Sequence, residues 1–377
     1  MKTYLITGAA GFIGSNFLKY MLGRHPQERF IALDALTYAA SYQTIEKDVD
    51  DKRCVFVKGS ILDGMLLDSL FEEYDIDVVV HFAAESHVDR SIDGPRLFLE
   101  TNIMGTQTLL DAARKSWQTG VDASGYPVYR AGCRYHQVST DEVYGALGPE
   151  GFFSELTPLN PHSPYSASKA SADLVVQCYR DTFHLPVSIS RCSNNYGPYQ
   201  FPEKLIPLVI NNILQGRSIP VYGDGLQVRD WLYVMDHCSA IERIILQGAD
   251  GCVYNVGGNN EVANIEIVRT ILSTIREILT EREDLRSCVT APQFLKDGDL
   301  DWIGEGLISY VRDRLGHDRR YAIDASKLSR ELSWNPSTRF REGIRSTILW
   351  NLENRSWVDT VTSGAYRDYY ERMYRGR

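Results

Sequence analysis

The feature that most constrains the fold is a glycine-rich turn near the N-terminus. The run Tyr4-Leu-Ile-Thr7 is typical of a buried strand, and a helical pattern covers 13–22. Between them stand Gly8, Gly11 and Gly14, with the spacing G-x-x-G-x-x-G. Glycines here allow a tight turn and let a pyrophosphate approach the helix N-terminus, whose free N–H groups favour an anion. The turn predicts the first β-α unit of a dinucleotide-binding sheet; the alternative is a turn that only packs the helix on the sheet.

The rest of the chain alternates between strand-like and helical patterns. Further strand-like runs lie at 30–33, 54–57, 78–82, 135–138 and 187–190. Helical patterns separate them, most clearly over 96–117 and 165–183. Such alternation is typical of β-α-β units, which form parallel sheets and bind ligands beyond the carboxyl ends of the strands. The predicted fold class is therefore α/β, a Rossmann-type doubly wound parallel sheet with a smaller C-terminal substrate-binding domain.

The amino-acid composition changes after Arg191, where proline, glycine and asparagine become frequent. We expect 1–190 to form the dinucleotide-binding domain and 191–377 to form mainly the substrate-binding domain. The segment 230–256 is expected to return to the first domain, beginning with a helix over 230–246. The acidic stretch 281–306 is expected to be an irregular surface excursion, and the polar loop 120–132 has no interpretation.

Charge and cysteine usage limit the classes of partner. The formal net charge is −9, from 40 basic and 49 acidic residues, which argues against a nucleic-acid or anionic-membrane surface. The seven cysteines are scattered without a C-x-x-C pair, so we expect reduced, buried thiols and neither a disulfide framework nor a zinc site. No signal-peptide pattern and no run of about 18 apolar residues is present, so we expect a soluble, cytoplasmic protein.

Asp34 narrows the choice of dinucleotide. It ends the second strand-like run, twenty residues beyond Gly14. A carboxylate at that position can accept hydrogen bonds from both ribose hydroxyls and repels a 2′-phosphate. The sequence therefore favours NAD over NADP.

A tyrosine and a lysine stand four residues apart at Tyr165 and Lys169. On a helix this spacing places both side chains on one face. A nearby ammonium favours the phenolate, which makes the tyrosine a better proton acceptor. The pair suits removal of a hydroxyl proton while the same carbon gives up hydride; the alternative is an ordinary exposed helical pair.

The run Ser139-Thr-Asp-Glu142 supplies two adjacent carboxylates, which simple alcohol oxidation does not need. In a regular strand, Asp141 and Glu142 would point to opposite faces. Both can reach one substrate only if the strand breaks immediately after Val138 or Ser139. The alternative is that the acids cap the following turn or face solvent.

These motifs occur in an order typical of one family. The full set is Gly8-x-x-Gly11-x-x-Gly14, Ala83-Ala-Glu-Ser-His-Val-Asp-Arg90, Ser139-Thr-Asp-Glu-Val-Tyr-Gly145, Tyr165-x-x-x-Lys169, Ser193-Asn-Asn-Tyr-Gly-Pro198 and Gly316-His-Asp-Arg-Arg-Tyr321. Over nearly its whole length the sequence resembles the extended branch of the short-chain dehydrogenase/reductases and, within it, the dTDP-glucose 4,6-dehydratases. The tyrosine–lysine pair marks only the superfamily, whereas the Thr-Asp-Glu run marks a dehydratase.

The resemblance implies an NAD-dependent hydro-lyase that converts dTDP-glucose to dTDP-4-keto-6-deoxy-glucose and water. Oxidation at C4 makes the C5 proton acidic, water is lost across C5 and C6, and the hydride returns to C6. Tyr165 would take the C4 hydroxyl proton, with Lys169 holding the nicotinamide ribose and Thr140 bonding the C4 oxygen. Glu142 would remove the C5 proton, and a protonated Asp141 would donate to the departing C6 hydroxyl.

The resemblance also implies which residues bind the two ligands. For the cofactor they are Gly8, Gly11, Phe12, Ile13, Gly14, Asp34, Thr37, Ser60, Ile61, Phe82, Ala83, Ala84, Ser86, Thr101, Tyr165, Lys169 and Asn195. For the nucleotide sugar they are Ser86, Thr140, Asn194, Lys204, Leu205, Pro220, Tyr222, Arg229, Asn264, Arg312 and His317. Each cation alone could instead be a solvated surface charge.

Several polar residues have a supporting role or an open one. Ser60 replaces the acidic residue that the family uses near the adenine. Asn102 either supports the active site or is an ordinary polar helix residue. His81 and His87 lack a ligand-like cluster, which favours core or positioning roles over metal binding.

The resemblance further implies a homodimer in which the helices over 96–117 and 165–183 pair as a four-helix bundle. Two alternatives remain open. One is a UDP- or CDP-sugar dehydratase or epimerase of the same superfamily, although an epimerase does not need the Asp-Glu pair. The other is a catalytically silent NAD-binding module.

Overall fold

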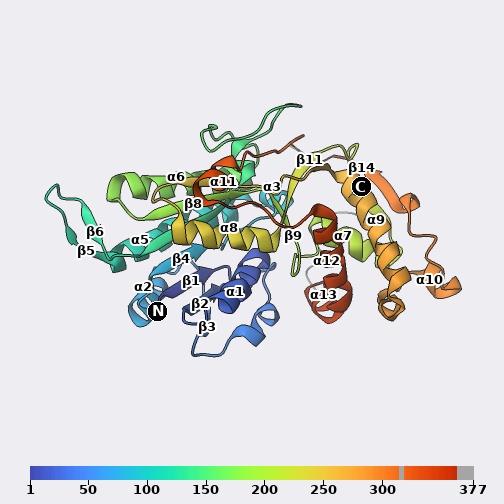
Figure 1. The fold of residues 1–377 in the computed structure, drawn as a ribbon, viewed down its shortest axis with the longest axis horizontal. Helices are drawn as coiled ribbons and strands as arrows, with labels where there is room; N and C mark the ends of the chain where they lie inside the picture. The colour runs from blue at the N-terminus through green and yellow to red at the C-terminus, as the bar shows by residue number, and fades with distance from the viewer. Residues whose placement is uncertain (314–317, 363–377) are drawn as a thin grey trace.

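The structure is a computed structural model that describes residues 1–313 and 318–362. Its centre is a seven-stranded sheet in the order β12-β8-β7-β4-β1-β2-β3, in which every neighbouring pair is parallel (Figure 1). The strands are β1 (Thr3–Thr7), β2 (Arg29–Asp34), β3 (Cys54–Lys58), β4 (Val78–His81), β7 (Arg134–Thr140), β8 (Val187–Cys192) and β12 (Val253–Val256). The predicted α/β fold class is confirmed.

Both faces of the sheet are covered by helices, which explains why β1, β4 and β8 are buried along their whole length. On one face, Ile6 of β1 packs in a cluster with residues of α1 and α8, and on the other, Leu5 packs with α2, α5 and α6. The alternation follows from the two-residue period of a strand. These helices are α1 (Phe12–Arg24), α8 (Val234–Gln247), α2 (Gly64–Tyr74), α5 (Gly105–Trp117) and α6 (Pro164–Phe183).

A second apolar core lies to one side of the sheet, where Figure 1 shows α7, α9, α12 and α13 gathered. Its helices are α7 (Leu205–Leu214), α9 (Asn264–Glu281), α10 (Pro292–Asp297) and α12 (Phe340–Glu353). α13 (Arg355–Val361) lies beside them, with its Trp357 against Trp350 of α12. Small sheets join it to the rest, formed by β9 (Asn194–Tyr196), β11 (Val228–Tyr233), β13 (Glu261–Ala263), β10 (Ile219–Tyr222) and β14 (Ile308–Val311). The division into two domains near residue 190 stays a prediction.

The helix predicted over 230–246 is wrong in its first part. β11 continues to Tyr233, and α8 begins at Val234. The extended conformation is held because β11 pairs with β9 on one side and β13 on the other, with Trp231 and Leu232 buried. β12, which ends at Val256, does lie in the large sheet.

The helix predicted over 96–117 is interrupted. α4 (Pro95–Leu99) gives way to the π-helical turn η3 (Glu100–Met104), and only then does α5 begin. A π turn inserts an extra residue and redirects side chains. Here it turns Asn102 inward, where its amide bonds the backbone N–H and carbonyl of Glu85 at 2.9 and 3.0 Å and the Ser168 hydroxyl at 2.8 Å.

The acidic stretch 281–306 is not only a surface excursion. It contains η5 (Glu283–Cys288), α10 and η6 (Glu305–Leu307), and its apolar side chains complete the second core. Leu285, Val289, Leu300 and Ile303 are buried against α9 and its neighbours. The charged residues therefore face solvent while the apolar ones hold the segment in place.

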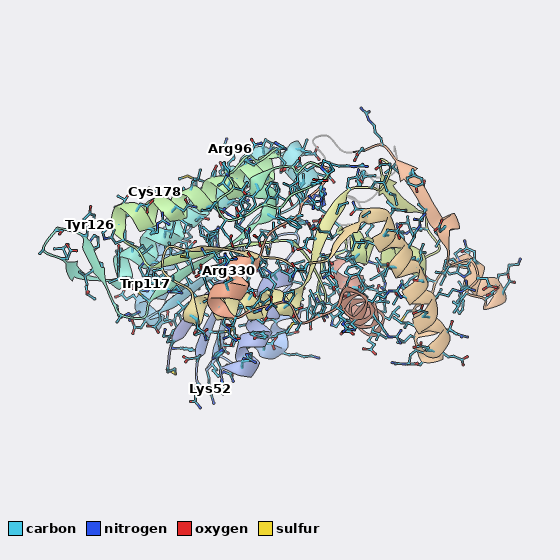
Figure 2. The ribbon with its side chains drawn as sticks, turned by 45° about the horizontal axis from the view of Figure 1, so that its top comes forward. Lys52, Arg96, Trp117, Tyr126, Cys178 and Arg330 are labelled. Carbon is cyan, nitrogen blue, oxygen red and sulfur yellow. The ribbon has the colours of Figure 1, made fainter. Side chains whose placement is uncertain are left out.

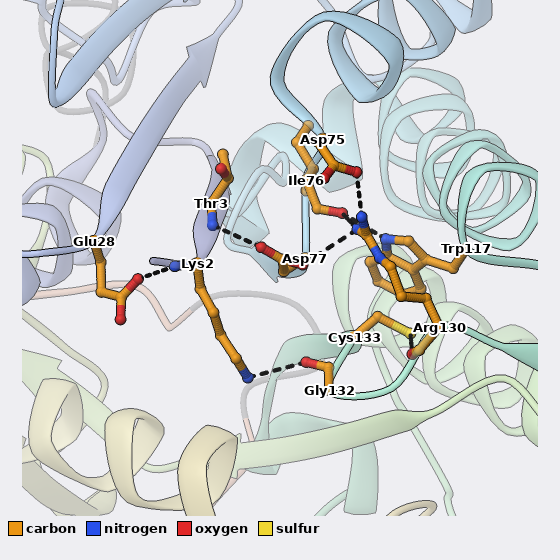
Figure 3. Close-up of polar contacts among 10 residues, drawn as sticks. All are labelled: Lys2, Thr3, Glu28, Asp75, Ile76, Asp77, Trp117, Arg130, Gly132 and Cys133. Carbon is orange, nitrogen blue, oxygen red and sulfur yellow. Dashed lines mark hydrogen bonds and ion pairs between the residues drawn. The ribbon is translucent and has the colours of Figure 1, made fainter.

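The segment 120–132 forms an exposed hairpin of β5 (Gln118–Val121) and β6 (Pro127–Tyr129), at the end of the molecule away from α9 (Figure 1). Tyr126 at its tip stacks on His184, with ring centroids 4.0 Å apart, and lies on the same outer side of the molecule as Cys178 and Arg96 (Figure 2). At its base, Arg130 pairs with Asp75 and donates to the Ile76 carbonyl at 2.8 Å (Figure 3).

The base of the hairpin lies at the amino end of the sheet. Asp77 accepts from the Thr3 N–H at 2.9 Å, and Trp117 donates to the Ile76 carbonyl at 2.7 Å (Figure 3). This end is opposite to the carboxyl ends of the strands, where parallel sheets bind ligands. The hairpin therefore belongs to the side of the protein away from the predicted site.

Two further observations concern the chain as a whole. None of the helices in the described ranges combines the length and apolar character needed to cross a membrane. The seven cysteines all lie in these ranges and are free thiols; four are buried, but Cys178 is exposed and Cys252 and Cys288 are only partly buried, so the prediction of burial is wrong for these three.

Candidate active site

The two adjacent carboxylates stand where β7 ends. The strand continues to Thr140, and the 3₁₀ turn η4 (Asp141–Tyr144) follows at once. The predicted break therefore exists but lies one or two residues later than Val138 or Ser139, because Ser139 and Thr140 still pair with β8. The Thr140 hydroxyl caps the turn by accepting from the Glu142 N–H at 3.2 Å. The turn removes the alternation of a strand, so Asp141 and Glu142 line the same cavity.

Tyr165 and Lys169 reach this cavity from the first turns of α6. Ser163 and Ser166 form a reciprocal capping box and Pro164 begins the helix, which fixes where its first turn starts. Both Tyr165 and Lys169 are buried, and the lysine ammonium donates to the Val138 carbonyl of β7 at 2.8 Å. The two motifs, more than twenty residues apart in sequence, thus meet at one place.

A buried ion pair holds these two segments in register. The Arg191 guanidinium of β8 donates to Asp173 of α6 at 2.8 Å and to the Tyr144 hydroxyl of η4 at 3.0 Å. Tyr144 in turn donates to Asn255 of β12 at 2.8 Å. Asp173 lies one helical turn beyond Lys169, on the same face of α6. Arg191 therefore links the helix that carries the tyrosine–lysine pair to the turn that carries the acids.

Burial keeps Asp141 in its neutral form. The pKa of its carboxyl is raised well above the usual range, first by loss of solvation and then by the negative charges of Glu142 and Asp230. Arg229 and the hydrogen bond from Thr140 oppose this rise without cancelling it. Asp141 is therefore suited to donate a proton rather than to accept one.

The predicted lowering of the Tyr165 pKa by Lys169 is wrong for this arrangement. Burial, followed by the charges of Glu142, Cys192 and Asp141, raises the pKa of the phenol well above its ordinary value. The Lys169 ammonium is directed to the Val138 carbonyl instead, and burial lowers its own pKa. The phenolate, once formed, is accordingly a strong base.

A cavity of about 490 Å³ extends from these residues to the glycine turn. All of the residues predicted to bind the cofactor line it, from Gly8 to Asn195. Within it, Asp34 accepts from the Ala10 and Leu36 N–H groups at 2.9 and 2.7 Å. These bonds fix the carboxylate and leave lone pairs for two hydroxyl donors.

The glycine turn is closed against its neighbours. A Cβ atom on Gly14 would lie 2.1 Å from the Gly8 carbonyl oxygen, and one on Gly8 would lie 2.7 Å from the Ala83 nitrogen. Gly8 also has a φ of +69°, which L side chains rarely adopt. The start of α1 therefore opens toward the cavity with no side chain in the way, as a pyrophosphate site requires.

Several buried polar atoms on the cavity wall have no hydrogen-bond partner within the described residues. They include the Ser139 hydroxyl, Asp141 Oδ2, Asn194 Oδ1 and Trp231 Nε1. Buried donors and acceptors without partners are costly, and their gathering on one wall indicates a polar ligand. The cavity therefore fits a dinucleotide at the glycine turn and a hydroxylated substrate at the acids.

A second cavity of about 190 Å³ adjoins the first and shares part of its wall. Most residues predicted to bind the nucleotide sugar line it, namely Ser86, Asn194, Lys204, Leu205, Pro220, Tyr222, Arg229 and Asn264. Thr140 lines the larger cavity. Arg312 is exposed and lines neither, and His317 lies outside the described residues.

Some residues of the site carried no clear sequence signal. Glu203 and Trp231 line both cavities, and Tyr321 lines the smaller one beneath the Arg229 guanidinium, 4.3 Å from its ring centroid. Trp231 reads as a core residue in an apolar run, and only its place on β11 brings it to the wall. Within residues 1–313 and 318–362, no group of three or more His, Cys, Asp or Glu side chains is placed to hold a metal ion.

His81 and His87 both have local partners. His81 is buried between the Thr7 and Thr106 hydroxyls, at 2.7 and 3.1 Å, and burial lowers its pKa to about 3. It is therefore a neutral core residue. The His87 ring caps the N-terminus of α3 (Val88–Asp93).

Comparison with known proteins agrees with this geometry. The family model described as GDP-mannose 4,6 dehydratase matches residues 5–347. A dTDP-glucose 4,6-dehydratase from Xanthomonas campestris pv. campestris is 50% identical over 367 residues, which cover 97% of this chain and 98% of the relative.

Two solved structures are similar over almost the full length. One is a dTDP-glucose 4,6-dehydratase from Bacillus anthracis in complex with NAD, at 43% identity and a TM-score of 0.79, covering 96% of this chain and 100% of that one. The other is a dTDP-glucose 4,6-dehydratase from Streptomyces venezuelae, solved with NAD and a second ligand. It is 41% identical with a TM-score of 0.81, covering 95% of this chain and 99% of that one.

Gly14→Ala is expected to weaken dinucleotide binding by about tenfold or more, because the new Cβ would displace the Gly8 carbonyl from beneath the helix start. Titration with NAD measures the effect. Gly23→Ala on the same helix is the control, since its Cβ would have no neighbour within 4 Å. It should leave binding unchanged and stabilise the fold by up to about 1 kcal/mol. Equal affinities in both variants would contradict the predicted role of the turn.

Asp141→Asn is expected to stabilise the protein at neutral pH while removing the proton donor. The folded-state pKa of Asp141 is raised, so the wild type is fully stable below the unfolded-state pKa of about 3.9 and loses stability as pH rises toward the folded-state pKa. The asparagine side chain of the variant does not ionise, so it causes no such loss of stability. Denaturant unfolding with saturating NAD should show a variant-minus-wild-type difference that grows from pH 4 upward. A difference independent of pH would contradict the raised pKa.

Proposed function

The chain belongs to the dTDP-glucose 4,6-dehydratase family, and we propose on this basis the chemistry that each part of its site performs. The protein is an NAD-dependent hydro-lyase that converts dTDP-glucose to dTDP-4-keto-6-deoxy-glucose and water. One observation supports the assignment of its site above all others. The Thr140–Glu142 turn, with the buried carboxyl of Asp141, lines one cavity together with Tyr165 and Lys169.

The residues around the glycine turn are proposed to hold the cofactor. The chemistry that bound NAD supplies is hydride transfer, from C4 in the first step and to C6 in the last. The open N-terminus of α1 suits the pyrophosphate, and the fixed Asp34 carboxylate suits the two adenosine ribose hydroxyls. Lys169 stands deeper in the cavity, where it can donate to the nicotinamide ribose.

The proton transfers are assigned to three side chains. Tyr165 takes the C4 hydroxyl proton, for which its phenolate must form first. Glu142 then takes the C5 proton, which the C4 ketone has made acidic. Asp141 gives its proton to the C6 hydroxyl, so that the C6–O bond breaks and water leaves. Hydride return to C6 leaves C5 in need of a proton, which Glu142 would give back. The proton that Tyr165 has gained then balances the one that Asp141 has lost.

The smaller cavity is proposed to hold the nucleotide diphosphate. Arg229 is already oriented there, because it donates to the Val228 and Asp318 carbonyls at 2.8 Å each and lies over the Tyr321 ring. With Lys204 it supplies positive charge for two phosphate groups. Arg312 and His317 remain proposed contacts of the nucleotide sugar.

The protein is also proposed to be a cytoplasmic homodimer. Large apolar side chains are exposed along α4, η3 and α6, namely Leu97, Leu99, Met104 and Leu174. Arg96 and Cys178 mark the same outer side of the molecule in Figure 2. A second copy that packs on this face would bury these side chains in a helix bundle. Light scattering should give the mass of two chains, and a mass of one chain would contradict the proposal.

The central test follows the hydrogen on C4. With dTDP-glucose deuterated at C4, the product should carry deuterium at C6. A label that stays at C4 without a deoxy product would indicate an epimerase, and no turnover at all would indicate a module that only binds NAD. Turnover of UDP-glucose at the same rate would show that the enzyme does not distinguish the thymidine nucleotide from the uridine nucleotide.

Glu142→Gln tests the assignment of the base. Loss of the C5 proton acceptor should lower kcat by about 10²- to 10⁴-fold. Glu150→Gln is the matched control, because Glu150 is exposed on the following loop and lines neither cavity. A Glu142→Gln enzyme as active as the control would show that another group removes the proton.

A further inference from the structure

Three side chains from separate segments meet beside the two cavities, where one of them, Glu203, lines both. Tyr38 follows β2, Arg90 lies in α3, and Glu203 stands just before α7. We call these three residues the wall cluster. They are brought together from positions as far apart as 165 residues, between Tyr38 and Glu203.

Each pair of residues in the wall cluster is in direct contact. The Tyr38 hydroxyl donates to Glu203 Oε1 at 3.1 Å, and Arg90 Nε lies 3.4 Å from Glu203 Oε2. The Arg90 guanidinium also lies over the Tyr38 ring, 3.6 Å from its centroid. The ring of Tyr38 further meets Phe201 edge-on at 5.8 Å.

Burial makes these contacts strong. The Glu203 side chain is only 3% exposed, and His87 adds a second nitrogen 3.8 Å from its Oε2. Loss of solvation raises the pKa of this carboxyl, while Lys204, Arg90 and Tyr38 act in the opposite direction. A buried carboxylate is strongly unfavourable without its partners, so removing either Arg90 or Tyr38 should loosen the segment that carries Glu203.

The position of the cluster gives it a consequence for the ligands. The neighbours of Tyr38 in the chain, Thr37, Ala39 and Ala40, line the large cavity on the side of the glycine turn. Glu203 and Lys204 line both cavities. The wall cluster therefore ties the loop beside the dinucleotide to the segment beside the nucleotide sugar.

We propose that Tyr38, Arg90 and Glu203 form a latch that holds the loop after β2 against the 201–204 segment and so slows the release of NAD. The inference rests on the proposed function in naming NAD as the retained ligand. A latch has a purpose there, because the hydride removed from C4 must still be at hand when C6 is reached. These are positioning residues; they act through the loop that lines the cofactor cavity.

The test measures how fast NAD leaves the purified holoenzyme. Radiolabelled NAD is bound, excess unlabelled NAD is added, and the label remaining on the protein is followed with time. Tyr38→Phe removes one hydroxyl but keeps the ring under Arg90, and Arg90→Met removes the charge but keeps an apolar stem. We expect dissociation to be faster by about fivefold for Tyr38→Phe and tenfold or more for Arg90→Met, since the arginine change leaves the buried Glu203 carboxyl without its ion-pair partner.

Two matched controls make the same kinds of substitution outside the wall cluster. Tyr42→Phe alters a half-exposed tyrosine of the same loop that does not line the cavity. Arg269→Met removes an exposed arginine of α9 whose partners, Glu266 and Glu305, are also on the surface. Both should release NAD at the wild-type rate. If Tyr38→Phe and Arg90→Met also release NAD at that rate, the latch does not exist.

Thermal unfolding with saturating NAD separates a latch from a general loss of stability. The Tyr38→Phe variant should unfold within about 3 °C of Tyr42→Phe, because one hydrogen bond is a small part of the total. If Arg90→Met does not fold, Tyr38→Phe alone decides the question. The measurement needs no sugar substrate. If the variants release NAD faster but the wild type does not turn over dTDP-glucose, the latch is supported and the proposed function is rejected. If the wild type is active but the variants release NAD at the wild-type rate, the proposed function is supported and the latch is rejected.

Discussion

A buried guanidinium connects the two segments on which the chemistry depends. Arg191 leaves β8 and donates to Asp173 of α6 and to Tyr144 of η4, with both members of the ion pair almost fully buried. Neither charge is stable in that place without the other. The pair therefore fixes the distance between the helix that carries Tyr165 and the turn that carries Glu142. The remaining features of the site are arranged around this link.

The site keeps polar groups in positions that do not favour folding. Asp141 is buried beside two other carboxylates, and Ser139 and Trp231 present polar atoms without partners to the cavity wall. Each of these costs stability in the folded chain. A substrate that supplies hydroxyl and phosphate partners removes part of the cost, and the same burial keeps Asp141 protonated for its role as an acid. The buried polar groups of the site thus lower the stability of the fold but serve the reaction.

The two cavities are distinct but mechanically joined. Glu203 lines both cavities. Its partners are Tyr38, from the loop after β2, and Arg90, from α3. The order of events in the proposed reaction requires that both ligands stay in place between oxidation and reduction. Contacts that link the residues around the cofactor to the residues around the nucleotide sugar meet this requirement better than two independent pockets would.

By itself, the sequence determined the parallel sheet and the glycine turn with Asp34, because these depend on local periodicity and spacing. Its resemblance to a family predicted that the Thr-Asp-Glu run would act together with Tyr165 and Lys169. It did not determine that β7 continues to Thr140, that a π turn directs Asn102 inward, or that β11 precedes α8. Only the tertiary structure decided those points, since strand pairing and side-chain bonds from distant segments override local preference. The raised pKa values of Asp141 and Tyr165 and the position of Glu203 were decided there too, because burial is a property of everything packed around a residue.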